Sequence, residues 1–107
     1  MVNITLKIFN TLDRKKEVFK PLKDRKVGLY TCGPTVYDFA HLGNFRTYVW
    51  QDMLKRWLLY RGFKVKHVMN LTDVDDKTIK GARKEGIKLK DFTQRYTKAF
   101  FDDMKSL

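Results

Sequence analysis

The sequence of 107 residues has a single cysteine, Cys32, so no internal disulfide can form and nothing indicates an oxidising compartment. No apolar run approaches the ~20 residues that span a bilayer. The opening segment, MVNITLKIFN, lacks the apolar core and the cleavage site of a signal peptide. These absences predict a cytoplasmic protein with no membrane partner.

Acidic residues are also scarce: 12 Asp and Glu stand against 23 Lys and Arg, which gives a formal net charge of +11. This positive field attracts polyanions, which include nucleic acid, nucleotides and acidic membrane surfaces. A lysine-rich solvated surface would explain the same composition, so the charge alone leaves nucleic-acid binding open. Hydrophobic residues, at 43% of the chain, exclude a disordered polar protein and predict one small globular unit.

Two common nucleotide-binding motifs are missing, G-x-G-x-x-G and G-x-x-x-x-G-K-[ST], so neither a dinucleotide-binding domain nor a P-loop is supported. What the sequence does contain is a regular succession of elements. Alternating residues predict a short strand in LKIFNT, a basic loop follows in DRKKEVFKPLKDRK, and a β-rich run predicts a strand over residues 27–32. Gly33 and Pro34 end that strand.

A helix is expected from about residues 41–44 to Gly62, because apolar residues recur three and four positions apart between them. Four aromatic residues on and around its apolar face are expected to pack in the core instead of stacking on bases: Tyr48, Trp50, Trp57 and Tyr60. Residues 63–72 predict a second strand, which completes a βαβ crossover with two parallel strands. Two further helices are expected over residues 73–84 and 90–107.

Three polar clusters fall where these elements begin and end. Residues 32–35 (CGPT) lie at the end of the first strand, residues 41–44 (HLGN) open the helix, and residues 70–73 (NLTD) lie at the end of the second strand. The carboxyl ends of parallel strands meet at one edge of a sheet, where the ligands of α/β proteins bind. A helix amino terminus offers free N–H groups to a phosphate, and Gly43 would let a nucleotide lie against the backbone.

HLGN also has the form H-x-G-[HN], the signature of class I aminoacyl-tRNA synthetases, and it stands in the expected place after a first strand. Within that class, the longer string LYTCGPTVYDFAHLGN, followed by YRGFKVKHVMNLTDVDDK, resembles cysteinyl-tRNA synthetases. The resemblance implies an α/β fold, the first half of a Rossmann-like nucleotide-binding domain with a parallel sheet. Residues 1–107 would be the amino-terminal, incomplete part of this catalytic domain, which agrees with the last predicted helix running to the final residue.

The reaction that the resemblance implies uses ATP, accompanied by Mg²⁺, to convert L-cysteine into cysteinyl-adenylate, and then transfers the cysteine to tRNA(Cys). His41 and Asn44 match the catalytic positions, and together with Gly43 they match the ATP-binding positions. Donors held there would stabilise the negative charge that grows on the α-phosphoryl oxygens. Asn44 departs from the commonest form of the motif, which ends in His, and can donate a hydrogen bond without carrying a charge. The later Lys-rich K-M-S-K-S loop of the family is missing, so the isolated chain is expected to be inactive.

The cysteine pocket and the metal are also implied by the resemblance. Gly33, Thr35 and Thr72 match residues that line the pocket, Gly33 through its backbone and Thr72 through its hydroxyl. Cys32 matches the first ligand of a Zn²⁺ ion that selects cysteine by its sulfur, because Zn²⁺ binds thiolates more strongly than hydroxyls. Three further ligands are expected beyond Leu107.

Ordinary structural roles remain open for several of these residues. A cysteine at a strand end is typically a small buried apolar residue, and a histidine near a helix start is typically a cap or a surface residue. The acids Asp73, Asp75 and Asp76 could suggest a metal cluster, but Asp73 three residues before Asp76 favours a helix cap with acids in the first turn. His67, inside a strand, is a poor candidate for a metal ligand.

Two other functions remain open besides cysteine–tRNA ligation. The first is a related enzyme that joins cysteine to an amino sugar, as in mycothiol synthesis, with the same zinc and adenylate chemistry. The second is a short basic module that binds tRNA or another nucleic acid without catalysis.

Overall fold

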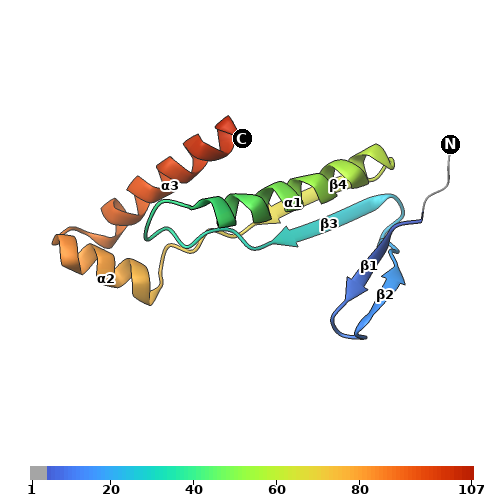
Figure 1. The fold of residues 1–107 in the computed structure, drawn as a ribbon, viewed down its shortest axis with the longest axis horizontal. Coiled ribbons are helices and arrows are strands. Elements are labelled where there is room, and N and C mark those ends of the chain that lie inside the picture. Colours follow the sequence, from blue (N-terminus) through green and yellow to red (C-terminus); the bar gives the residue numbers. More distant parts are fainter. Residues whose placement is uncertain (1–4) are drawn as a thin grey trace.

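A computed structural model describes residues 5–107, so the first four residues of the opening segment lie outside the described residues. Two strands near the beginning, β1 (Lys7–Asn10) and β2 (Lys15–Val18), form an antiparallel hairpin (Figure 1). The expectation of a loop throughout this basic segment is therefore wrong for β2. Its charged side chains reach water on an exposed ribbon while the backbone pairs with β1, and the Glu17 carboxylate accepts a hydrogen bond of 3.1 Å from the Asn10 amide.

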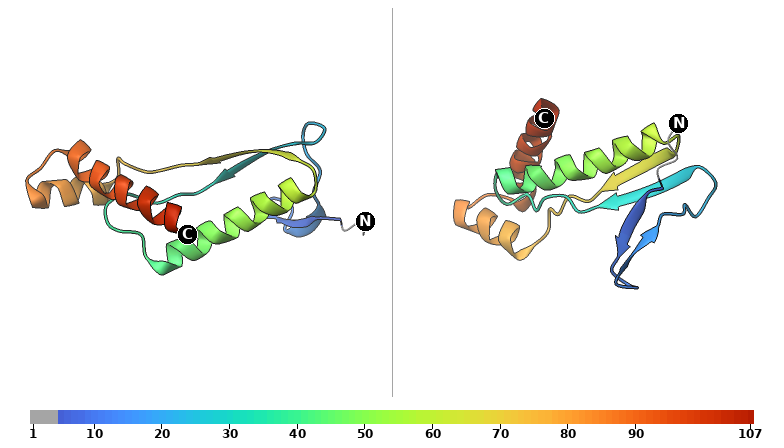
Figure 2. Two further views of the ribbon diagram at one scale, coloured as in Figure 1. Left: turned by 90° about the horizontal axis from the view of Figure 1, so that it is seen from above. Right: turned by 45° about the vertical axis from the view of Figure 1, so that its right-hand side comes forward.

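The predicted βαβ crossover consists of β3 (Lys26–Thr31), α1 (Leu42–Tyr60) and β4 (Lys64–Met69). β3 and β4 pair in parallel along all six residues of each strand. α1 runs along one face of these two strands, which Figures 1 and 2 show from three directions. The prediction of an α/β fold with a parallel sheet is confirmed.

α1 ends at the predicted place, and Gly62 follows it at a φ of 87°, a left-handed conformation that favours glycine. Tyr48 and Leu58 are buried. The expectation of core packing is wrong for Trp50 and Tyr60, whose exposed fractions are 64% and 77%. The reason is geometric: one stripe of a helix contacts a two-stranded sheet, and the rest of its surface stays open.

α2 (Asp76–Glu85) and α3 (Leu89–Ser106) form a helix pair at the opposite end of the molecule from the hairpin (Figure 1). Gly81 allows the two helices to approach closely, because a Cβ there would lie 2.3 Å from Cζ of Phe92. α3 also reaches α1, where the rings of Phe100 and Tyr48 meet edge to face with 5.5 Å between their centroids. This contact joins the helix pair to the crossover unit.

The cap of α2 is Asp75, so the prediction that Asp73 caps this helix is wrong. The Asp75 carboxylate accepts from the backbone N–H of Lys77 at 2.9 Å, and the Asp75 backbone N–H donates to the Thr78 hydroxyl at 2.9 Å. Asp76 does lie in the first turn, as expected. Residues 73–74 instead carry the chain from the sheet edge to the helix.

The elements lie in a row and do not surround one core. The radius of gyration is 17.6 Å and the principal extents are 57 × 32 × 24 Å. A compact chain of this size has a radius of gyration of about 13 Å. Within residues 5–107, no helix combines the length and apolar character needed to cross a membrane.

Candidate active site

The loop after β3 and the segment after β4 continue side by side beyond the ends of the two strands. The Thr72 N–H donates to the Pro34 carbonyl at 2.9 Å, and the Val36 N–H donates to the Thr72 carbonyl at 3.0 Å. Thr35 and Thr72 form an isolated parallel bridge. The fold therefore brings two of the predicted cysteine-pocket residues together from positions 37 residues apart.

Gly33 is required here by contact with the opposite segment. A Cβ at this position would lie 1.9 Å from the Asn70 carbonyl oxygen and 2.8 Å from Cγ of Met69. The Gly33 N–H donates to the Asn70 side-chain oxygen, which ties the loop to the end of β4. Asn70 thus fixes the position of Gly33 relative to the end of β4.

Cys32 is exposed, so its alternative role as a small buried residue is wrong. Its Sγ lies 3.6 Å from the Gly33 carbonyl oxygen. Its own carbonyl accepts a hydrogen bond of 3.0 Å from the Gln51 amide of α1, whose other side-chain atom, Oε1, is buried with no hydrogen-bond partner among the described residues. Burial raises the pKa of the Tyr48 phenol, and negative charge on Cys32 would raise it further.

One protein thiolate does not make a metal site. The part of the chain from residue 5 onward contains no group of three or more His, Cys, Asp or Glu side chains that could hold a metal ion. His67 lies in β4, and its Nε2 is 2.7 Å from the Thr31 hydroxyl. An exposed Cys32 fits the role of a single zinc ligand, and any further ligands would have to come from outside these residues.

The HLGN motif forms the start of α1. His41 is the N-cap, and its Nδ1 accepts from the Gly43 N–H at 3.0 Å. The side-chain oxygen of Asn44 accepts from the His41 N–H at 3.1 Å. The two polar residues of the motif therefore form a reciprocal capping box. The ordinary role of His41 as a cap is confirmed.

The cap uses one polar atom of each side chain and leaves the other free to bind a ligand. Because Nδ1 of His41 accepts a backbone N–H, the neutral ring carries its proton on Nε2. Because the oxygen of Asn44 is an acceptor in the cap, its Nδ2 amide remains a donor. Both donors lie at a helix amino terminus, where the backbone dipole also favours negative charge.

Contact with the His41 ring explains why residue 43 is glycine. A Cβ there would lie 2.9 Å from Cε1 and 3.1 Å from Nδ1 of the His41 ring. The glycine makes room for the imidazole in its capping position. Close approach of a nucleotide to the Gly43 backbone remains a prediction.

Residues 18–107 match a family model described as the class I (C) tRNA synthetase catalytic domain. The chain belongs to this family. Among curated relatives, the cysteine–tRNA ligase of Chlamydia muridarum is 61% identical over 100 residues, which cover 94% of this chain and 21% of the relative. The cysteine–tRNA ligase of Protochlamydia amoebophila is 54% identical over 105 residues, 98% of this chain and 22% of the relative.

A third curated relative, the cysteine–tRNA ligase of Brachyspira hyodysenteriae, is 57% identical over 99 residues, 92% of this chain and 21% of the relative. The chain therefore spans about a fifth of the length of the curated relatives it matches. The resemblance to cysteinyl-tRNA synthetases that the motifs indicated is confirmed at the level of the family.

Sequence reasoning placed Asn70 in the polar cluster at the end of the second strand without assigning it a role, and it missed Gln51 altogether. No sequence signal identifies Gln51, because its contact with the Cys32 carbonyl depends on how α1 is rotated above the sheet.

Proposed function

We propose that this chain supplies the HLGN half of the active site of a cysteine–tRNA ligase. The reaction is the ATP-dependent activation of L-cysteine to cysteinyl-adenylate, followed by transfer to tRNA(Cys). The observation that carries the proposal is the capping box of α1, which leaves the donors of His41 and Asn44 free at a helix amino terminus. The curated relatives, all cysteine–tRNA ligases at 54–61% identity, supply the substrate class.

His41 and Asn44 act on the phosphates of ATP in this proposal. Nε2–H of the neutral His41 ring and Nδ2 of Asn44 donate to α-phosphoryl oxygens, on which charge grows as the cysteine carboxylate attacks. Donors fixed before the reaction need no rearrangement, and each contributes about 10²–10³ to the rate in comparable sites. Gly43 supports the His41 ring and offers its backbone side to the nucleotide.

Gly33, Thr35 and Thr72 form the cysteine pocket. Both backbone polar groups of Thr72 are bonded to the neighbouring segment, so its hydroxyl is held at a defined place for the substrate amino group. Gly33, with no room for a side chain, presents backbone alone. Cys32 beside it would hold Zn²⁺, which supplies a Lewis acid that prefers the thiolate of cysteine to the hydroxyl of serine.

The test is a chimera in which this chain replaces the matching segment of the Chlamydia muridarum ligase. The chimera is expected to catalyse cysteine-dependent exchange of pyrophosphate into ATP and to charge tRNA(Cys), with serine as the control substrate. The isolated chain is expected to do neither. A folded chimera without cysteine-dependent exchange would overturn the proposal, and joining of cysteine to an amino sugar instead of tRNA would favour the mycothiol-type alternative.

A further inference from the structure

Gln51 is a half-buried polar residue of α1 whose side chain reaches the end of β3. Its Nε2 donates to the Cys32 carbonyl at 3.0 Å, between residues 19 positions apart in the sequence. An amide side chain can be placed in two orientations, but a carbonyl can only accept, so the nitrogen of Gln51 must face Cys32. The oxygen, Oε1, therefore lies on the other side, where it is buried with no hydrogen-bond partner among the described residues.

The unpaired oxygen indicates that Gln51 does more than stabilise the fold. A buried acceptor without a partner costs stability, because it gives up its hydrogen bonds with water and gains none in return. A methionine of similar length would fill the same space without that cost. What methionine would not supply is the donor that holds the Cys32 carbonyl.

The peptide group that joins Cys32 to Gly33 is held from both sides. Its carbonyl accepts from Gln51, and its N–H, which belongs to Gly33, donates to the Asn70 side-chain oxygen. β3 and β4 both end before this peptide. Two amide side chains, one from α1 and one from the end of β4, therefore hold it in place of the strand ladder.

A planar peptide group that is bonded at both its carbonyl and its N–H has a fixed orientation. That orientation sets the backbone angles on either side of it, and with them the directions of the Cys32 side chain and of the Gly33 carbonyl. The Cys32 thiol is exposed, and its Sγ lies 3.6 Å from the Gly33 carbonyl oxygen. The proposed zinc ligand and a proposed residue of the cysteine pocket therefore share one support.

The helix that carries Gln51 also carries the donors proposed to act on ATP. His41 and Asn44 form the cap at its start, and Gln51 lies about two turns after Asn44, so Asn44 and Gln51 lie on nearly the same side of α1. A helix of this length moves as one body. α1 therefore sets the position of the Cys32 carbonyl relative to the HLGN cap.

We infer that Gln51 is a positioning residue for the selection of cysteine. Through the Cys32 carbonyl it fixes the direction in which the Cys32 thiolate meets Zn²⁺, and it contacts neither the metal nor the substrate itself. The inference rests on the proposed function, because it takes Cys32 as a zinc ligand. Residues that orient the ligands of a metal contribute about 10–100-fold to metal affinity or activity.

Gln51→Met in the chimera removes the donor while nearly keeping the length of the side chain. The affinity for Zn²⁺, measured by competition with a chromogenic chelator, is expected to fall about tenfold. At saturating Zn²⁺, KM for cysteine in pyrophosphate exchange is expected to rise about tenfold while kcat changes less than about twofold. The preference for cysteine over serine should fall with it.

The melting temperature of the metal-free chimera separates positioning from a purely structural role. Gln51→Met is expected to change it by less than about 3 °C, because the loss of one hydrogen bond and the removal of the unpaired Oε1 offset each other. Gln94→Met, at an exposed position of α3, is the matched control and should change neither Zn²⁺ affinity nor KM. A lower melting temperature with unchanged Zn²⁺ affinity in Gln51→Met would show that Gln51 is only structural.

A double variant tests whether Gln51 acts through Cys32. In a Cys32→Ala background the thiolate is gone, so adding Gln51→Met should cause no further loss of Zn²⁺ affinity. The same tenfold loss in that background would overturn the inference. Unchanged Zn²⁺ affinity in Gln51→Met, in a chimera that binds Zn²⁺ and prefers cysteine, would overturn this inference alone. An unsubstituted chimera that binds no Zn²⁺ would overturn the proposed role of Cys32, and the inference with it.

Discussion

Single residues of the HLGN motif have a structural role that the fold shows and, in the proposed function, a binding role as well. The Nδ1 atom of His41 caps α1 while its Nε2 remains a donor. In Asn44, the side-chain oxygen takes part in the cap while Nδ2 remains a donor. The two glycines differ in how strictly they are required. Gly33 faces a backbone carbonyl that cannot move away, whereas Gly43 faces an imidazole ring that can turn. We therefore expect alanine at Gly33 to be far more damaging than alanine at Gly43.

The two roles of His41 can be separated by two substitutions in the chimera. His41→Asn keeps a good N-cap, so the melting temperature should stay unchanged. Because the shorter side chain cannot place a donor where Nε2 lies, pyrophosphate exchange should fall about 10²–10³-fold. His41→Ala should lose the same activity and, in addition, about 1 kcal/mol of stability. Thermal unfolding and the exchange assay measure both effects. Full activity in His41→Asn would show that the ring only caps the helix.

At the scale of elements, the connection from β4 to α2 decides which acid caps the helix. The N–H and the carbonyl of Thr72 both form hydrogen bonds with the segment after β3. Two more residues, at positions 73 and 74, then carry the chain away from the edge of the sheet. The helix therefore begins after Asp75, with Thr78 as the partner of the capping box. The spacing of the acids favours Asp73 as the cap, and the path of the chain selects Asp75 instead.

This assignment predicts different costs for two neighbouring aspartates. Asp75→Ala should reduce the free energy of unfolding by about 1 kcal/mol, because the Lys77 N–H loses its acceptor. Asp73→Ala, at an exposed position outside the cap, should change it by less than about 0.5 kcal/mol. Denaturant unfolding of the chimera compares the two, and Asp75→Asn, which keeps a capping oxygen, is the control. Equal effects at the two positions would contradict the assignment of the cap.

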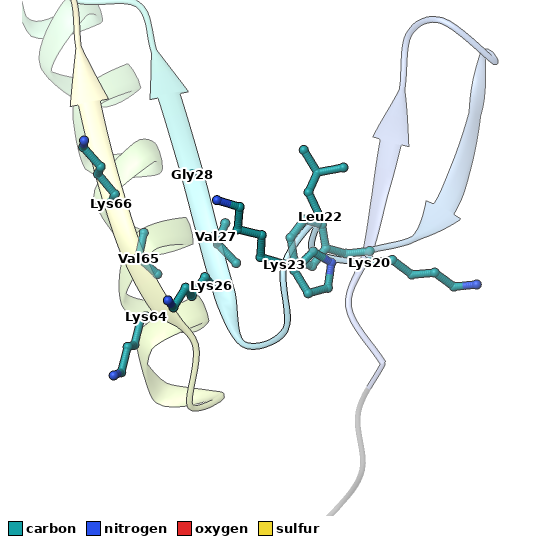
Figure 3. A pocket seen from close by; sticks show the side chains of 11 residues that line it. Lys20, Leu22, Lys23, Lys26, Val27, Gly28, Lys64, Val65 and Lys66 are labelled. Carbon is teal, nitrogen blue, oxygen red and sulfur yellow. The ribbon is translucent and has the colours of Figure 1, made fainter.

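For the whole molecule, the elongated shape leaves two large surfaces open. One is a cleft of about 550 Å³ beside the sheet (Figure 3), lined by Lys20, Lys23, Lys26, Lys64 and Lys66 among other residues. The other is an apolar groove of about 670 Å³ between α1 and Leu6, whose lining includes Trp50, Met53 and Tyr60. Contiguous exposed apolar side chains such as these are found on faces that pack against other polypeptide.

Small-angle scattering tests whether the isolated chain keeps this open shape. The expected radius of gyration is near 17.6 Å, and collapse onto the open faces would move it toward about 13 Å. Measurement at low and high salt controls for repulsion among the 11 excess positive charges, because salt screens such repulsion but leaves the packing of elements unchanged. A value that falls toward the compact limit at high salt would show that charge, and not the fold, extends the chain.

The sequence by itself determined the crossover unit, the place of Cys32 at a strand end and the HLGN motif at the start of α1. These features depend on local periodicity, capping chemistry and the rule that parallel strands end at one edge. Only the tertiary structure decided that Lys15–Val18 forms a strand, that Trp50 stays exposed and that Gln51 bonds to the Cys32 carbonyl. Each of these depends on which segments meet in space. Pairing, burial and contact each depend on two segments that meet in space, whereas a sequence pattern describes a single segment.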